Sequence, residues 1–344
     1  MIHKMKMNNL TRNSLFISFA VLALLFISCG DSGPKRDTAT SGHVRIAADE
    51  TLRPIVSEWV NAFQNLYTET KVDIDYFPEK ELFNRLIHDS INFVIATRDV
   101  TPEELPILLK KEDRPRVSKL AYEAIAAITN LSSKDSLMTF ESISDLLTGK
   151  STRWNQLCTD SKNQNEIQII FDNNGSSILR YFIDTLKLKS KINPNISSAA
   201  SCKEVIQAVS KSKNALGFVN LAWVSNGDAA ESQSFLNSIQ VAKISPPAYI
   251  KGGNYFYRPY IAHLAEQIYP PHVYDNSTGT YKMVGDSTYT YPYIRTIYAV
   301  NAEGRVGLAT GFASFIAGEK GQRIALQAGL LPATMPVRPV NFTK

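Results

Sequence analysis

The chain has few of the residues that build disulfide frameworks or metal centres. Among its 344 residues are three cysteines, and its five histidines are scattered without an H-x-x-x-H pair or a histidine–cysteine group of ligand spacing. We therefore expect no metal site, and no motif indicates a cofactor. Cys158 and Cys202 lie in the body of the chain, and the sequence leaves open whether they form a disulfide.

A strong positive charge is also missing. The formal net charge is +5, and Lys4, Lys6 and Arg12 account for three of these charges, so the chain beyond residue 28 carries +2. A nearly neutral body lacks the dense basic stripe that binds a phosphate backbone, which excludes a nucleic-acid partner. Its composition, 44% hydrophobic and 20% charged, is that of a globular protein with a sizeable core.

The one extended apolar run near the N-terminus, residues 15–27, is shorter than a membrane-spanning helix. It follows basic residues and ends at Ser28, Cys29 and Gly30, which is typical of an export signal. A cysteine directly after a small residue resembles a bacterial lipoprotein signal, in which the thiol is acylated, for example with palmitate, and becomes the first mature residue. We predict a signal peptide at 1–28, a lipid anchor on Cys29, a flexible polar tether over 29–42, and a location on the periplasmic face of the bacterial envelope. An ordinary secretory peptide is the alternative.

Strand patterns alternate with helix patterns along the body of the chain. Short apolar or alternating runs predict strands at 44–48, 72–77, 92–96, 122–128, 167–171 and 215–219, and a β-rich segment at 287–300. Amphipathic periodicity predicts helices after residue 51, at 79–89, 142–147 and 201–210, and as a pair over 311–329. This alternation implies parallel strands with helices on the sheet faces, and ligands bind such sheets at the carboxyl ends of the strands. The segment 252–286, dense in Tyr, Pro and Gly, is either a functional lid or a loop packed on the body.

Residues 171–186, FDNNGSSILRYFIDTL, join a polar loop to an amphipathic helix. Asn173, Asn174, Ser176 and Ser177 can all cap that helix, whose first turn presents unpaired N–H groups and the positive end of the helix dipole. Such a helix start binds anions, although any capped surface helix has the same residue types. The segment therefore predicts either an anion site or an ordinary capped helix.

Several separated segments resemble one family, the phosphate ABC-transporter substrate-binding proteins of the type II periplasmic-binding-protein superfamily. These segments are IAADETLRPIVSEW at 46–59, VIATRDVTPEEL at 94–105, YEAIAAITN at 122–130, SISDLLTGKSTRWNQL at 142–157, DNNGSS at 172–177, ALGFVN at 215–220, YPYIRTIY at 291–298 and FASFIAGEKGQRIALQAGLLPA at 312–333. Their order over nearly the whole chain beyond the leader makes the resemblance specific.

The resemblance implies an α/β fold, a two-lobed clamshell of mixed sheets flanked by helices with a ligand cleft between the lobes. Lobe I would comprise 43–125 and 295–344, and lobe II would comprise 126–294 with the insertion 252–286. It also implies a monomer without enzymatic activity that delivers inorganic phosphate or a similar oxyanion to an ABC permease. Carried over by position, the ligand-binding residues are Asp49, Glu50, Thr51, Thr97, Arg98, Asn174, Gly175, Ser176 and Ser177, with Arg180 able to reach back toward the cleft.

Two of these turns depart from the family's pattern. Asp49 and Glu50 stand where hydroxyl donors are usual, and Asp172 stands where an arginine is usual. Carboxylates repel phosphate unless they are protonated or paired, although a single acceptor would select a monoprotonated phosphate over sulfate. Arg98 and Arg295, like Arg180, could face the cleft or form salt bridges.

These acids leave two alternatives open. The same fold could bind an amine, a polyol or a cation for sensing, because fold alone does not settle function. A secreted hydrolase could use Asp49, Glu50 and Asp172 for acid–base chemistry as in glycoside hydrolysis, although no nucleophile elbow or Ser/His/Asp pattern accompanies them.

Overall fold

The computed structural model describes residues 37–88, 91–110, 114–158, 161–188, 192–225, 230–248, 255–259, 268, 272–275, 280–283 and 291–334. The predicted signal peptide, the predicted lipidation site Cys29 and residues 29–36 of the predicted tether lie outside these ranges. Within them, no helix is both long and apolar enough to cross a membrane.

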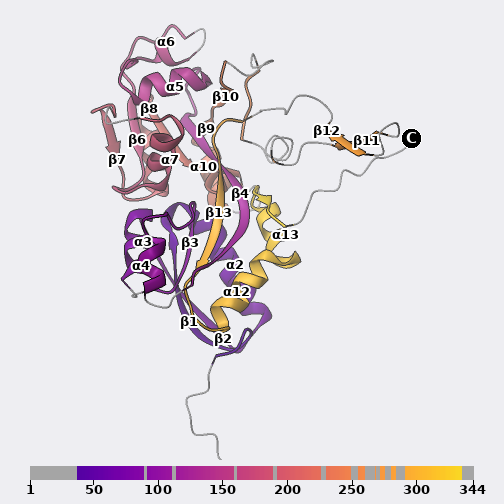
Figure 1. Cartoon of the computed structure of the whole chain (residues 1–344). Coiled ribbons are helices and arrows are strands. Elements are labelled where there is room, and N and C mark those ends of the chain that lie inside the picture. The colour runs from indigo at the N-terminus through magenta and orange to yellow at the C-terminus, as the bar shows by residue number, and fades with distance from the viewer. Residues whose placement is uncertain are drawn as a thin grey trace, which may run out of the picture. The chain divides into compact units, whose positions relative to one another are not determined.

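One lobe contains the N-terminal strands. β1 (Gly42–Asp49) pairs in parallel with β2 (Thr70–Phe77) and with β3 (Phe93–Ala96), as the sequence predicts. The helical elements of this lobe are η1 (Glu50–Leu52), α2 (Arg53–Leu66), α3 (Glu79–Ile87), α4 (Leu105–Lys110), α12 (Leu308–Ala317) and α13 (Glu319–Gln327) (Figure 1). Trp59 of α2 is fully buried and donates its indole N–H to the carbonyl of Gly321 in α13 at 2.9 Å. The two ends of the chain therefore share one core.

The other lobe is built from the middle of the chain. β6 (Gln168–Phe171) pairs in parallel with β7 (Ile196–Ser198) and with β8 (Ala215–Asn220). Its remaining elements are β5 (Leu137–Thr139), α5 (Phe140–Leu147), α6 (Trp154–Leu157), α7 (Ser177–Thr185), α8 (Cys202–Lys211), α9 (Ala222–Ser225), α10 (Ala230–Leu236), β9 (Ile239–Val241) and β10 (Lys243–Ser245). The helices predicted at 142–147 and 201–210 correspond to α5 and α8.

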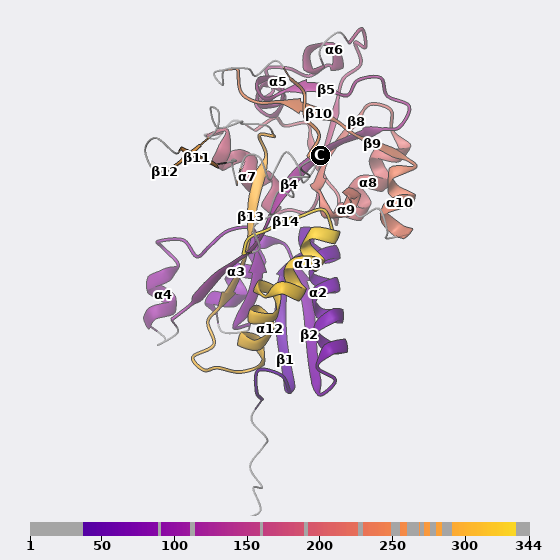
Figure 2. The same ribbon diagram turned by 90° about the vertical axis from the view of Figure 1, so that its right-hand side faces the viewer.

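Two long strands, β4 (Arg116–Asn130) and β13 (Ile294–Asn301), connect the lobes (Figures 1 and 2). β4 pairs antiparallel with β13 and with β14 (Leu331–Pro332) up to Ala124, and with β8 and β9 from Ile125 onward. The parallel pairing that the strand–helix alternation implies does not hold at these strands, because the chain returns along a neighbour there and does not cross over through a helix. The mixed sheet that the family resemblance implies is confirmed. One mixed sheet, in the order β2-β1-β3-β13-β4-β8-β6-β7, thus continues through both lobes.

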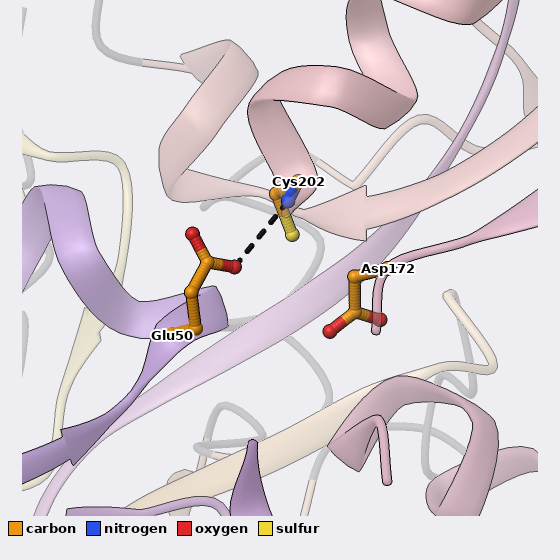
Figure 3. A group of neighbouring side chains, drawn as sticks. All are labelled: Glu50, Asp172 and Cys202. Carbon is orange, nitrogen blue, oxygen red and sulfur yellow. Dashed lines mark hydrogen bonds between the residues drawn. The ribbon is translucent and has the colours of Figure 1, made fainter. Parts of the chain in front are cut away.

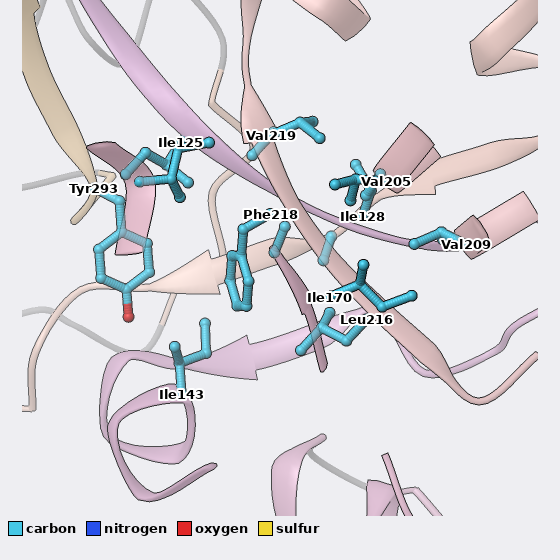
Figure 4. Close-up of a cluster of buried hydrophobic side chains, with 14 of the residues drawn as sticks. Ile125, Ile128, Ile143, Ile170, Val205, Val209, Leu216, Phe218, Val219 and Tyr293 are labelled. Carbon is cyan, nitrogen blue, oxygen red and sulfur yellow. The ribbon is translucent and has the colours of Figure 1, made fainter. Parts of the chain in front are cut away.

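Each lobe buries its own apolar side chains. In the lobe of β6 to β8, the ring of Phe218 stacks on Phe171 at 5.0 Å and meets Phe182 edge-on at 4.9 Å, and Tyr293 packs against Phe182. Figure 4 shows Phe218 and Tyr293 among the buried aliphatic side chains of this core. Gly217 lets α8 approach β8 closely, since a Cβ at this position would lie 2.7 Å from a methyl carbon of Val205. Close packing of α8 on β8 fixes where the first residue of α8 stands.

The segment 252–286 lies mostly outside the described residues. Its described part includes an antiparallel pair of strands, β11 (His272–Asp275) and β12 (Thr280–Met283), so the segment is not irregular throughout. Whether it acts as a lid stays a prediction.

Candidate functional site: the cleft between the lobes

Hydroxyl groups from both lobes meet where strands of the sheet end. Thr51 follows β1 and Thr97 follows β3, while Ser177 begins α7 just after β6. The hydroxyl oxygens of Thr51 and Ser177 lie 3.4 Å apart, and all three residues are buried. β1 and β3 are parallel, so Thr51 and Thr97 lie at the same edge of their lobe. Ser177 meets this edge from the other lobe, at the start of α7.

Arg295 of β13 reaches into this group of hydroxyls. Its Nη1 donates to Ser177 Oγ at 2.9 Å and to Thr97 Oγ1 at 3.4 Å. Its Nη2 forms an ion pair with Glu123, which stands directly opposite it on β4, and both side chains are fully buried. Burial raises the pKa of Glu123 to about 7, because loss of solvation outweighs the attraction of Arg295. The contact with Glu123 on one side and the hydrogen bonds to Ser177 and Thr97 on the other hold the Arg295 guanidinium in place in the cleft.

A second guanidinium, that of Arg180 on α7, binds a carboxylate of the opposite lobe. Its Nε donates to Glu79, its Nη2 donates to Glu79 Oε2 at 3.2 Å and to Thr97 Oγ1 at 3.4 Å, and its Nη1 donates to Asp184 at 2.9 Å. Thr97 in turn donates to Glu79 Oε2 at 2.8 Å. The Glu79 carboxylate, with its side chain 2% exposed, therefore occupies donors from both lobes. An oxyanion ligand would offer the same donors similar oxygen acceptors.

Three further carboxylates are buried beside these donors. Asp49 accepts the N–H of Thr51 through Oδ1 at 2.9 Å, and its Oδ2 has no hydrogen-bond partner. Glu50 accepts the N–H of Cys202 at 3.3 Å, and Asp172 accepts from Ser176 and Asn173. Burial raises the pKa of all three carboxyls above their usual range, that of Asp172 to about 7.

The start of α7 is capped by Ser176. Its Oγ accepts the N–H groups of Ile178 at 3.2 Å and Leu179 at 3.1 Å. Gly175 precedes it with a φ of +103°, a left-handed conformation that favours glycine. Asn174 is exposed, so of the four predicted capping residues Ser176 performs that role and Ser177 turns its hydroxyl into the cleft. The Ser176 hydroxyl therefore donates to Asp172 and also accepts the N–H groups at the start of α7.

Arg98 pairs with carboxylates of its own lobe, and its Nε lies 3.7 Å from Glu79 Oε1. Its two Nη atoms bind both oxygens of Glu104 at 2.7 and 2.8 Å, and its guanidinium carbon lies 3.4 Å from the centre of the Phe83 ring. A cavity of about 380 Å³ next to it is lined by Glu79, Lys80, Arg98, Gly175, Ser176, Leu179, Arg180 and Ile183. The structure thus brings Thr51, Thr97, Ser177 and Arg180 together, and it leaves Arg98, Gly175 and Asn174 at the margin of the cleft.

The sequence does not single out Glu79 or Glu123 as site residues. It indicates Arg295 only as a cation that could either face the cleft or form a salt bridge. A signal for two of them is present in the sequence. Glu123 is a lone carboxylate in the apolar strand 122–128, and Arg295 is a lone cation in YPYIRTIY. Isolated opposite charges in two buried strands indicate a buried pair, because a charge is rarely buried without a partner. Glu79 carries no such signal, since an acidic residue at a helix start is common on protein surfaces.

Comparison with known proteins agrees with this fold. A model of the PBP superfamily domain matches residues 33–320. The phosphate-binding protein PstS of Borreliella burgdorferi is 26% identical over 192 residues, which cover 53% of this chain and 65% of that protein. The chain therefore spans slightly less than two thirds of the length of this curated relative.

Two solved structures share the fold over most of the chain. A Clostridium perfringens protein, described as a phosphate ABC transporter substrate-binding protein with bound phosphate, superposes with a TM-score of 0.64 at 18% identity, covering 85% of this chain and 99% of that one. An ABC-type phosphate transport receptor from Vibrio cholerae superposes with a TM-score of 0.58 at 14% identity, covering 85% and 100%. With a family model that matches most of its length and a two-lobed sheet of this kind, the chain belongs to the PBP superfamily, the periplasmic binding proteins.

Proposed function

We propose that the chain is an extracytoplasmic substrate-binding protein that captures phosphate, or a similar small oxyanion, for an ABC importer. The observation that carries this proposal is the convergence of Thr51, Thr97 and Ser177 with the guanidiniums of Arg180 and Arg295 in a buried part of the cleft. Hydroxyl and guanidinium donors bind tetrahedral oxyanions through charge-assisted hydrogen bonds. The names of the Borreliella burgdorferi, Clostridium perfringens and Vibrio cholerae relatives support the same ligand.

Glu79 has a defined part in this proposal. A bound phosphate would take over donors of Arg180 and Thr97 that Glu79 now occupies. A carboxylate left beside the ligand can accept a hydrogen bond from a monoprotonated phosphate, whereas sulfate at neutral pH has no proton to donate. The site would therefore prefer phosphate to sulfate.

The other parts of the proposal follow from the sequence resemblance. We propose a signal peptide at 1–28, a lipid anchor on Cys29, an ABC permease as partner, a monomeric state and no catalytic activity. The division into 43–125 with 295–344, and 126–294, is supported by the separate cores, since Ala121 and Ile297 pack in one of them and Ile128 and Tyr293 in another.

A second candidate ligand is favoured by one specific observation. Asp49, Glu50 and Asp172 are buried at the same cleft, and a carboxylate-rich wall suits an amine or a cation. Titration of the metal-free chain separates the two candidates, because phosphate binding supports the first, and amine binding without phosphate binding supports the second.

Isothermal titration calorimetry tests the phosphate proposal. We expect Ser177→Ala to weaken phosphate binding by about 10- to 150-fold, because a hydrogen bond to a charged ligand contributes roughly 1.5–3 kcal/mol. Ser314→Ala is the matched control, since this exposed serine of α12 donates only within its own helix, to Thr310 O. Phosphate affinity that is equal in the wild type and Ser177→Ala, or an absence of phosphate binding by the wild type, would contradict the proposal.

A further inference from the structure

Three potential metal ligands lie together at the cleft. One oxygen of Glu50, one oxygen of Asp172 and the sulfur of Cys202 are all within 4.8 Å of one another, and all three residues are buried (Figure 3). Glu50 comes from η1 in one lobe, whereas Asp172 follows β6 and Cys202 begins α8 in the other. Figure 3 shows the three side chains near one another, with the Glu50 carboxylate facing the N–H of Cys202.

Neighbouring groups hold these side chains in place. The N–H of Cys202 donates to Glu50 Oε2 at 3.3 Å, and the two oxygens of Asp172 accept from Ser176 and Asn173. An ionised carboxylate has about four acceptor positions, so these hydrogen bonds leave lone pairs for a cation. Supporting hydrogen bonds of this kind orient the ligands of metal sites.

A separate observation also indicates a missing cation. Among the described residues, the Oδ2 atom of Asp49 has no hydrogen-bond partner by geometry, although the residue is 1% exposed and its carboxyl lies near Ser177 and Arg295. Its negative charge also acts on Glu50, Asp172 and Cys202. The cations that act here are Arg53, whose Nε is 3.5 Å from Glu50 and whose side chain is 46% exposed, and Arg295, which already pairs with Glu123. A buried carboxylate oxygen without a partner is costly, and a bound cation would remove that cost.

We propose that Glu50, Asp172 and Cys202 bind one divalent cation of the zinc class, with a water molecule completing the coordination. A sulfur ligand selects zinc or a similarly soft ion over magnesium and calcium, which prefer oxygen alone. Ligand bonds of 2.0–2.3 Å in a tetrahedron separate ligand atoms by about 3.3–3.8 Å, so the three groups need only a small contraction around the ion. On binding, the thiol of Cys202 releases its proton to solvent and the sulfur bonds to the metal.

The two cysteines of the described chain provide a matched test. Both are free and buried, but Cys158 lies at the end of α6 and is not part of the group of ligands. We expect the full chain, freed of metal by a chelator, to bind one equivalent of Zn²⁺ in calorimetry, and Cys158→Ala to bind it equally well. Cys202→Ala should bind Zn²⁺ more than about 100-fold more weakly, because the loss of even an outer-shell partner costs about 10- to 100-fold.

Substitution of Co²⁺ for Zn²⁺ reports the sulfur ligand directly. We expect a thiolate-to-cobalt charge-transfer absorption in the wild type and in Cys158→Ala, and its loss in Cys202→Ala. If Cys202→Ala fails to fold, Asp172→Asn takes its place and should lower the affinity while it keeps the absorption. An absence of stoichiometric Zn²⁺ binding, equal binding by Cys202→Ala, or equal competition by Mg²⁺ would overturn the proposal.

This site is independent of the proposed phosphate function. Phosphate is titrated into the metal-free chain, so a failure to bind phosphate refutes the proposed function and leaves the zinc result standing. Conversely, Ser177→Ala should retain Zn²⁺ binding, because Ser177 is not among the three ligands.

Discussion

At the scale of single residues, Arg295 connects the architecture of the chain to its cleft. It lies on a strand that joins the lobes, it is balanced by Glu123 in the neighbouring strand, and it directs one edge at Thr97 and Ser177. A buried ion pair adds little to stability by itself, but it holds a guanidinium in one place without solvent. The position of this positive charge is therefore fixed before any ligand arrives.

The Glu123 carboxyl makes the stability of the chain depend on pH. Its pKa in the folded chain is about 7, above the ordinary value of 4.5. The protonated carboxyl therefore contributes to the free energy of unfolding fully below pH 4.5, and this contribution is lost as the pH rises through 7. Glu123→Gln cannot ionise. Between pH 5 and pH 8 the wild type should therefore lose on the order of 3 kcal/mol of its free energy of unfolding relative to Glu123→Gln.

Urea denaturation of both proteins across this pH range measures that shift. Glu319→Gln is the control, because Glu319 is an exposed residue that pairs with Arg323 on the same helix. A difference between Glu123→Gln and the wild type that stays constant with pH would contradict the prediction.

Part of the cleft can be predicted from the sequence, and the rest cannot, for a physical reason. Thr51, Thr97 and Ser177 each follow a strand that the hydrophobic pattern predicts, so their places beyond the strand ends could be predicted. The pairing of Glu79 with Arg180 joins residues about one hundred positions apart in different lobes. Such a contact depends on how the lobes face each other, which no local pattern specifies. The same limit applies to Glu50, Asp172 and Cys202, whose spacing matches no metal motif.

At the scale of elements, the packing of α8 on β8 determines where Cys202 and the cleft-facing end of the sheet lie. Most helices and strands of the described chain could be predicted because their periodicity is strong. The antiparallel pairing of β4 could not, since a run of apolar residues looks the same in a parallel and an antiparallel sheet. β4 also extends to Arg116, well before the predicted start at residue 122.

Gly217→Ala tests the contact between α8 and β8. The added Cβ would lie 2.7 Å from Val205 Cγ1 and 2.8 Å from Val209 Cγ2, so we expect a loss of about 1–3 kcal/mol from overpacking. Gly304→Ala is the control, because a Cβ there meets nothing within 4 Å. Urea denaturation measures both changes, and equal stability of the two variants would show that α8 adjusts without strain.

At the scale of the whole molecule, several hydrogen bonds between described residues join the two lobes at the cleft. They include the indole N–H of Trp223 to Thr51 O at 2.9 Å, Cys202 N to Glu50, Arg180 to Glu79 and to Thr97, Arg295 to Ser177, and the pair of hydroxyls of Thr51 and Ser177. Arg180 and Glu79 form the ion pair among them, and charge-assisted hydrogen bonds are the stronger kind. This pair should hold the lobes together when no ligand is bound.

Glu79→Gln should therefore make the ligand-free chain more open. We expect a larger radius of gyration in small-angle X-ray scattering than for the wild type, and a return toward the wild-type value when phosphate is added. Glu81→Gln serves as the control, since Glu81 lies on the same helix but pairs with Arg85 within its own lobe. A radius of gyration that is the same for both variants would show that the remaining contacts between the lobes suffice for closure.

The sharing of one core by the two ends of the chain has a consequence for biosynthesis. Phe63 of α2 packs edge-on against Phe312 of α12, so the N-terminal strands cannot finish their core until the last helices have been made. The middle of the chain, from about residue 124 to 293, contains nearly all of its own core and can fold first. A polypeptide that emerges N-terminus first would thus complete its central lobe before its leading one. Premature termination near residue 305 would leave the side chains of Trp59 and Phe63 without their cover.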